Sequence, residues 1–168
     1  SQLRAAEIFQ LDKKNNMKKY DPEWWASLPP ERVGKETETI VENLFKEWNE
    51  RQDFAWHRLP DAKAARGRLA AQPADYIWRN IAVSGFLEVK ALNHPYRLPA
   101  SRLTQLPTLK KWTLANSKDI VLVHHYMQGL WTACFVKELG FGVPSWDLRD
   151  FPSFGTAERA LMGTGMFL

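Results

Sequence analysis

The sequence predicts an α/β (α+β) fold in which a central mixed β-sheet is flanked by helices. One segment carries apolar residues at helical spacing, and several short runs are rich in the β-branched and aromatic residues that favour strands. Along the chain the order is one helix, three strands, a second helix and two further strands. The expected strands cover residues 53–59, 75–78, 86–92, 119–127 and 130–139.

The first helix is predicted over residues 30–49, because its apolar side chains recur on one stripe. The stripe consists of Ile40, Val41, Leu44, Phe45 and Trp48. Thr37 also falls on it, while Glu38 and Glu36 lie at its opposite edges. Each glutamate either reaches a site beside the sheet or remains a solvated acid.

The first predicted strand, residues 53–59, alternates between two faces as a sheet requires. One face carries Phe54, Trp56 and Arg58. Residues 60–73 are expected to form a loop or a loosely extended hairpin arm. Residues 80–85 are expected to turn the chain between the second and third strands.

The second helix is expected between residues 101 and 116, where Pro107 is an obstacle. A proline inside a helix removes a hydrogen bond and clashes with the preceding turn, but it suits the first turn. The helix therefore either begins near Pro107 or is kinked there. After the last two strands, the tail from residue 140 is rich in Gly, Pro, Phe and Trp and is expected to wrap the core.

A length of 168 residues is typical of one domain with a single substantial core. We divide it into a basic and aromatic N-terminal arm (1–29), a core (30–140) and a tail that packs on or extends the core (141–168). Met17 is an alternative natural start, so residues 1–16 need not be native.

The charge is mildly basic, with a net charge of +4 and an isoelectric point near 9.2, which is compatible with a polyanionic partner. The basic residues cluster at Lys13, Lys14, Lys18 and Lys19, at Lys63, Arg66 and Arg68, and at Lys110 and Lys111. The single cysteine, Cys134, is expected to be a small buried hydrophobe in a reducing cytoplasm. No apolar run approaches the length of a membrane span, so no membrane partner is expected.

The segment Glu88-Val89-Lys90 ends an apolar run and follows Asp75 by thirteen residues. On a strand, Glu88 and Lys90 point to the same face, while Val89 points into the core. Two carboxylates and an ammonium at one place suit metal-dependent phosphodiester hydrolysis. The carboxylates supply hard oxygen ligands for Mg²⁺, and the lysine can orient or deprotonate a water molecule.

The residues Pro73-Ala74-Asp75 and Glu88-Val89-Lys90 resemble the signature of the PD-(D/E)XK nuclease superfamily. The E-x-K half matches fully, whereas Ala74 separates the proline from the aspartate in the first half. The pattern is closest to Holliday junction resolvases and related phage endonucleases. The resemblance covers roughly residues 31–139 and implies a restriction-endonuclease-like core.

The resemblance implies a site for Mg²⁺, for which Mn²⁺ would substitute, held by Asp75, Glu88 and the Val89 carbonyl. A helix glutamate completes the site in several resolvases; Glu38 fits best, with Glu36 and Glu42 as the alternatives. Lys90 would activate the water. Some members carry a glutamine on the helix after the E-x-K strand. Gln105 stands in that position, with an ordinary surface glutamine as the alternative reading.

The expected partner is DNA, branched or junction DNA in particular, cut by a homodimer in a bacterial or phage-infected cytoplasm. The expected DNA contacts are Lys63, Arg66, Arg68, Arg102, Lys110 and Lys111. The aromatic rings near Trp24, Trp25 or Trp146 are expected to pack in the core or the tail, with stacking on unpaired bases as the alternative. Another nuclease of repair, trimming or defence, or a non-catalytic nucleic-acid-binding module, is the alternative function.

The sequence offers no support for zinc or nucleotide chemistry. His124 and His125 are adjacent on a predicted strand, so they point to opposite faces and cannot chelate one metal together. His57 and His94 are isolated, and no Cys/His pattern suits zinc. A P-loop motif is also absent from the sequence.

Overall fold

The computed structural model describes residues 21–51, 53–61 and 72–168. Its centre is a six-stranded sheet in the order β1-β2-β3-β5-β6-β8. The bounds are β1 (Phe54–Arg58), β2 (Tyr76–Asn80), β3 (Ser84–Leu92), β5 (Ile120–His125), β6 (Leu130–Phe135) and β8 (Ser153–Phe154). Only the β3–β5 pair is parallel among these neighbours, so the sheet is mixed, as predicted.

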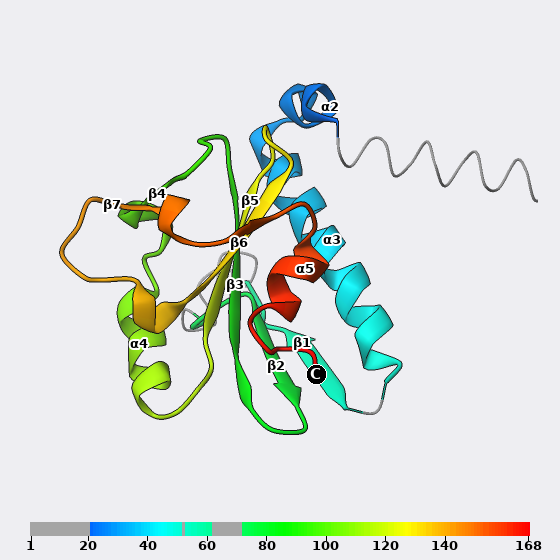
Figure 1. Ribbon diagram of the computed structural model, residues 1–168, viewed down its shortest axis with the longest axis vertical. Coiled ribbons are helices and arrows are strands. Elements are labelled where there is room, and N and C mark those ends of the chain that lie inside the picture. Colours follow the sequence, from blue (N-terminus) through cyan, green and yellow to red (C-terminus); the bar gives the residue numbers. More distant parts are fainter. Residues whose placement is uncertain (1–20, 52, 62–71) are drawn as a thin grey trace, which may run out of the picture.

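Helices cover both faces of the sheet (Figure 1). One face packs against α3 (Pro30–Asn49) and α5 (Ala157–Met162), while α4 (Leu106–Leu114) covers the other. The flanked mixed sheet confirms the predicted fold class. The range predicted for the first helix is that of α3, and Pro30 occupies the first turn, where its missing N–H has no partner to lose.

Most element bounds differ from the predicted ones by a few residues. Asp75 precedes β2 instead of opening it, and β3 begins two residues before the predicted Phe86. The strand predicted over residues 130–139 is β6, which ends at Phe135, after which η2 (Val136–Glu138) turns the chain. The second helix begins at α4 with Pro107 in its first turn, so it is not kinked; η1 (Ala100–Arg102) precedes it.

The two faces of β3 contribute side chains to two separate hydrophobic clusters. Leu87 and Val89 pack with α3 and α5, whereas Phe86 and Leu92 pack with α4. Glu88 lies between these last two residues in the alternation and shares their face. A charged pair of residues is therefore built into the otherwise apolar face that α4 covers.

The C-terminal part contributes both strand and helix to this architecture. A small second sheet pairs β4 (Arg97–Pro99) with β7 (Ser145–Asp147), followed by η3 (Leu148–Asp150). Beyond it, β8 adds an edge strand beside β6, and α5 packs on the same sheet. Leu161 and Met166 are fully buried there.

The described part of the predicted N-terminal arm forms α2 (Pro22–Ser27), which Asp21 caps through its side chain. Trp25 is 1% exposed and meets His124 edge-on at 4.7 Å, so this ring packs in the core, as expected in preference to base stacking. Trp146 is partly buried, and its indole N–H donates a hydrogen bond to the Gly140 carbonyl. No helix in residues 21–51, 53–61 or 72–168 is long and apolar enough to cross a membrane.

Some expectations concern residues outside the described ranges. They include the basic residues Lys13, Lys14, Lys18, Lys19, Lys63, Arg66 and Arg68, the alternative start Met17, and most of the predicted 60–73 loop.

A glycine on β3 provides a stability test of this packing. A Cβ built on Gly85 would lie 1.7 Å from the Lys118 carbonyl oxygen, whereas one on Gly34 of α3 meets no atom within 4 Å. We expect Gly85→Ala to destabilise the protein by about 1–3 kcal/mol or more, because the backbone of Lys118 must move. Gly34→Ala should stabilise it by about 0.5–1 kcal/mol.

Urea unfolding of both variants measures this difference. Equal stabilities of the two variants would contradict the close approach of β3 to Lys118.

Candidate functional site

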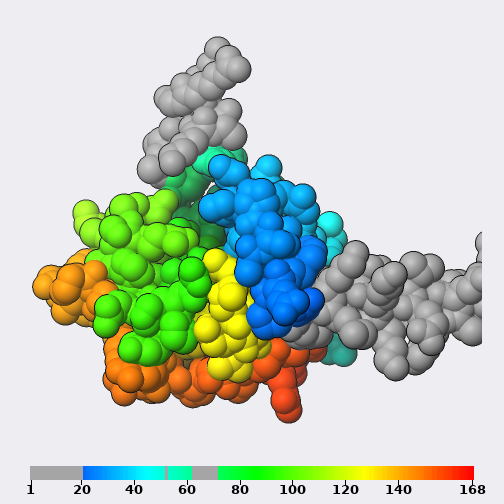
Figure 2. Space-filling model, turned by 90° about the horizontal axis from the view of Figure 1, so that it is seen from above, coloured from blue at the N-terminus to red at the C-terminus, as the bar shows by residue number. Residues whose placement is uncertain are grey.

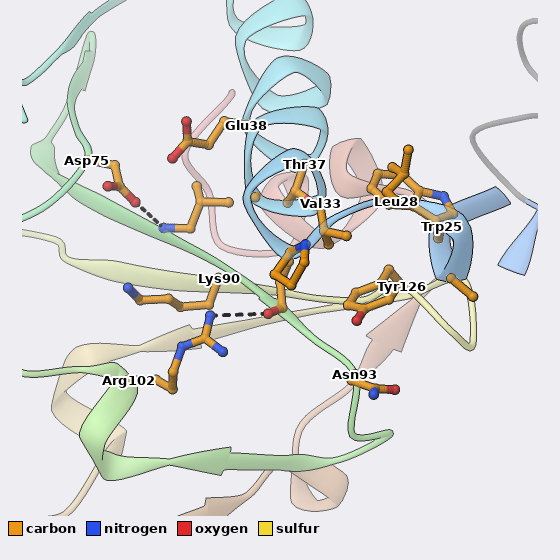
Figure 3. A pocket seen from close by; sticks show the side chains of 15 residues that line it. Trp25, Leu28, Val33, Thr37, Glu38, Asp75, Lys90, Asn93, Arg102 and Tyr126 are labelled. Carbon is orange, nitrogen blue, oxygen red and sulfur yellow. Dashed lines mark hydrogen bonds between the residues drawn. The ribbon is translucent and has the colours of Figure 1, made fainter. Parts of the chain in front are cut away.

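The site lies where β2 separates from β3. The antiparallel pairing of β2 with β3 ends at the pair Tyr76–Leu87. On the side of β2 that faces β1, the Leu59 N–H still donates a hydrogen bond to the Asp75 carbonyl. Two residues further along β3, the Val89 N–H donates to Asp75 Oδ2 at 2.8 Å (Figure 3). The Asp75 carboxylate thus takes the place of the missing strand partner.

The Val89 carbonyl is directed toward the same opening. In a strand, the N–H and C=O of one residue point to the same side, which for Val89 is the side of Asp75. The backbone of β3 therefore presents an oxygen beside this carboxylate.

Glu88 and Lys90 lie on one face of β3, as the alternation predicts. Lys90 Nζ is 3.0 Å from Glu88 Oε1, and the Glu88 side chain is only 3% exposed. The other oxygen, Oε2, is buried and accepts no hydrogen bond from the residues that the structure describes. Burial and then the negative charge of Asp75 raise the pKa of Glu88 to about 8, although Lys90 acts in the opposite direction.

Glu38 reaches the site from α3 and is held by Arg58 of β1. The Arg58 guanidinium lies 2.9 Å from Glu38 Oε2 and 3.2 Å from Glu42 Oε1, and it donates to the Tyr76 hydroxyl at 3.0 Å. Burial raises the pKa of Glu38, and the bond to Arg58 lowers it. The same burial, with the nearby carboxylates, raises the pKa of Tyr76.

The two alternatives to Glu38 are placed differently. Glu36 pairs with Arg32 one turn earlier on α3, at 3.0 Å, and both groups are solvent-accessible. Glu42 shares Arg58 with Glu38 but does not line the cavity described next. Of the three glutamates, Glu38 is the one that the fold brings to the site.

A cavity of about 400 Å³ joins these groups. Its lining includes Glu38, Asp75, Glu88, Lys90 and Gln105. Gln105 is the residue before α4, makes no side-chain capping bond to that helix and contributes to the cavity lining. All the residues singled out for catalysis in the sequence therefore line one cavity.

The donor set fits a divalent cation with few protein ligands. In the described part of the chain, no three Asp, Glu, His or Cys side chains are placed to hold a metal together. Mg²⁺ commonly uses one or two carboxylates, several waters and substrate phosphates. Asp75 and Glu88, with the Val89 carbonyl, match that need, and the buried Glu88 Oε2, which accepts no hydrogen bond from the described residues, is an oxygen that a cation would pair with.

The predicted DNA contacts are not all near the cavity. Arg102 lines an adjoining cavity and donates to the Ala91 carbonyl at 3.3 Å. Lys110 lies over the Phe141 ring at 4.7 Å, and Lys111 is exposed. Neither lysine lines either cavity.

Sequence reasoning missed the role of Arg58. A signal was present, because Arg58 shares the inward face of β1 with Phe54 and Trp56, and a charged group on such a face needs a partner. Asn93 and Tyr126, which follow β3 and β5, were also missed. No local pattern marks them, since their position depends on how the parallel strands pair.

The remaining titratable candidates are buried in the core. Burial, together with His125, lowers the pKa of His124 to about 3, and this ring bonds to Thr37 at 3.0 Å. His125 points to the other face of the sheet, toward the His94 carbonyl. Burial raises the pKa of the Cys134 thiol to about 12, so Cys134 is an inert core residue.

Comparison with known proteins finds distant similarity among solved structures only. No protein-family model and no curated protein matches the sequence. The fold is similar to that of Hjc, a Holliday junction resolvase from the archaeal hyperthermophile Archaeoglobus fulgidus, at 18% identity and a TM-score of 0.44. The match covers 74% of this chain and 92% of that one. At this distance, the chemistry of the chain rests on its own site geometry.

Proposed function

We propose that this protein is a Mg²⁺-dependent DNA endonuclease of the PD-(D/E)XK type that acts on branched DNA. One observation carries the proposal: Asp75, Glu88 and Lys90 converge in a cavity where Glu88 is buried with one oxygen unpartnered. Such a carboxylate is costly without a cation, because burial and a neighbouring carboxylate both oppose its charge. The four-way junction is the proposed substrate, as in the resolvases that the motif resembles.

Asp75, Glu88 and the Val89 carbonyl would hold the cation. When bound, Mg²⁺ would polarise the scissile phosphate and increase the acidity of a water molecule. Lys90 would position that water through its ammonium group, which lies 3.0 Å from Glu88 Oε1; only as the neutral amine, after losing a proton, would it accept a proton from the water. Glu38 would act through water, since in the described residues no three acidic side chains are placed to hold one metal. Gln105 would orient the same water or the phosphate.

Arg58 would position Glu38 without touching the reacting atoms. Its guanidinium binds Glu38 and Glu42 from the side of β1, so it keeps the Glu38 side chain directed into the cavity. A charged partner also favours the ionised form of Glu38 against the effect of burial.

A homodimer would supply two such sites for two symmetric nicks. The alternatives are a nuclease with another task or a non-catalytic nucleic-acid-binding module. The unpartnered Glu88 oxygen favours a catalytic protein, because a module that only binds DNA gains nothing from this costly group.

The first test is cleavage of a synthetic four-way junction by the purified protein. We expect Mg²⁺ or Mn²⁺ to support cutting and Ca²⁺ to support binding with little turnover, because Ca²⁺ accepts looser oxygen geometry. Glu88→Gln and Lys90→Ala should each lower the cleavage rate at least about 100-fold and leave junction affinity largely intact. Gel assays of cutting and of binding measure both quantities.

Glu36→Gln is the matched control, since Glu36 is on the same helix as Glu38 but pairs with Arg32 away from the cavity. It should cut at the wild-type rate, while Glu38→Gln should be slower. Full activity in excess EDTA, or wild-type cutting by Lys90→Ala, would sink the proposal.

The metal-free protein should lose stability as pH rises. Folding raises the pKa of Glu88 from an ordinary value near 4.5 to about 8, so the folded protein holds this proton more tightly. The stabilising contribution is full below the ordinary value and is lost as pH rises through about 8. Glu88→Gln should remove this dependence and raise the melting temperature in EDTA at pH 9 by about 5 °C.

Thermal melts at pH 6 and pH 9 give the comparison. Addition of Mg²⁺ at pH 9 should stabilise the wild type but not Glu88→Gln. If Glu88→Gln melts at the same temperature as the wild type at both pH values, the charge of Glu88 does not destabilise the metal-free protein.

The substrate preference should persist as salt rises. Non-specific affinity for phosphates falls steeply with salt, because each neutralised phosphate releases counterions. A junction that fits the protein makes many contacts at once, so we expect it to be preferred to linear duplex at low and at moderate salt. Replacing Lys63, Arg66 and Arg68 together should weaken binding to every DNA form without changing the chemistry.

Gel shifts and cleavage assays at two salt concentrations measure this preference. Equal binding and cutting of junction and linear duplex would leave a general nuclease and reject the junction as the specific substrate.

A further inference from the structure

A second cavity of about 510 Å³ continues from the candidate site. It shares Glu38, Asp75 and Lys90 with the first cavity and extends toward Asn93 and Tyr126 (Figure 3). Seen from above, the molecule is hollowed between the blue segment, which is α2 with the start of α3, and the green segment that follows β3 (Figure 2). Nothing in the proposed chemistry uses the far part of this cavity.

The far part lies at the carboxyl ends of the two parallel strands. β3 ends at Leu92 and β5 at His125, so Asn93 and Tyr126 are the first residues beyond each strand. In sheets with parallel strands, ligands bind in the crevice outside these ends, where side chains of adjacent strands converge. The position is therefore suited to a ligand that also reaches the carboxylates.

The lining is aromatic and apolar on one side and polar on the other. Tyr126 is partly buried, with its ring 6.1 Å from that of Trp25, and Leu28 and Val33 continue the apolar wall. Opposite them are the exposed side chains of Asn93 and Arg102.

The guanidinium of Arg102 is oriented by its bond to the Ala91 carbonyl of β3. It keeps further N–H donors, in the planar arrangement that matches a phosphate group.

The volume of this second cavity limits the size of the ligand that it can bind. Its volume lies within the range of about 300–1,000 Å³ that is typical of small-molecule sites. A space of about 510 Å³ matches one nucleotide and not a duplex, which is many nucleotides in volume. A nucleotide that has left the base stack presents a flat face for an aromatic ring and a phosphate for a guanidinium.

We propose that this second cavity binds one unpaired nucleotide next to the scissile phosphate. Its base packs on Tyr126, and its phosphate contacts Arg102 and Asn93. This inference rests on the proposed nuclease function and makes it more specific: the substrate is DNA with an unstacked nucleotide beside the cut, as at a branch point.

The test combines a change in the protein with a change in the DNA. Four-way junctions carry a single abasic residue at each position around the branch point, and binding is measured by fluorescence anisotropy in Ca²⁺. At one position, loss of the base should weaken binding to the wild type about tenfold. Tyr126→Ala should weaken binding to the intact junction by a similar factor and should show no further loss with that abasic junction.

Conservative and control variants separate stacking from folding. Tyr126→Phe keeps the ring and should bind like the wild type, while Arg102→Ala should weaken binding to intact and abasic junctions by the same factor. Phe141→Ala removes an aromatic side chain that is 59% exposed and outside both cavities. It should respond to every abasic position as the wild type does.

The inference and the nuclease proposal fail in different ways. If the losses from Tyr126→Ala and from the abasic residue multiply at every position, the base does not occupy this cavity. If the coupled loss is seen in binding but no metal supports cleavage, the cavity holds a nucleotide and the nuclease proposal is wrong. If the wild type does not bind junction DNA, both are rejected.

Discussion

The separation of β2 from β3 is the constraint on which the site depends. Beyond the pair Tyr76–Leu87, the central strand loses a neighbour, and an unpaired backbone N–H in such a position costs about 1–3 kcal/mol. The Asp75 carboxylate offsets this cost by accepting from Val89 at 2.8 Å. The bond that repairs the sheet therefore also fixes a carboxylate at the opening, and the gap in the ladder gives access to the site.

At the same place, the buried carboxylate of Glu88 destabilises the fold, whereas the hydrogen bond of Asp75 stabilises it. Apart from Lys90, the neighbours of Glu88 on this face of the sheet are apolar, and the negative charge of Asp75 adds to the cost of burial, so the pKa of Glu88 rises to about 8. Lys90 compensates only one of its two oxygens. A hydrophobic residue would be the more stable choice in such a position, and a group retained against stability usually serves function.

Sequence periodicity predicted the features that depend on a single helix or strand. Alternation along β3 placed Glu88 and Lys90 together, and helical spacing defined α3. The family resemblance preferred Glu38 to Glu36 but left both open, because both lie at edges of the apolar stripe; the position of Arg58 on β1 separates them. The short strands β4 and β7 had no periodic signal, because three residues are too few to show alternation.

The two adjacent histidines of β5 connect the core to both walls of the second cavity. On one face, His124 bonds to Thr37 of α3 and packs edge-on with Trp25, which holds α2 against the sheet. On the other face, His125 Nδ1 donates to the His94 carbonyl at 3.0 Å and so anchors the segment that carries Asn93. Burial lowers the pKa of both rings, so both are neutral near pH 7 and their packing is insensitive to charge there. The alternation that prevents these histidines from sharing a metal is what lets one strand position both sides of the cavity.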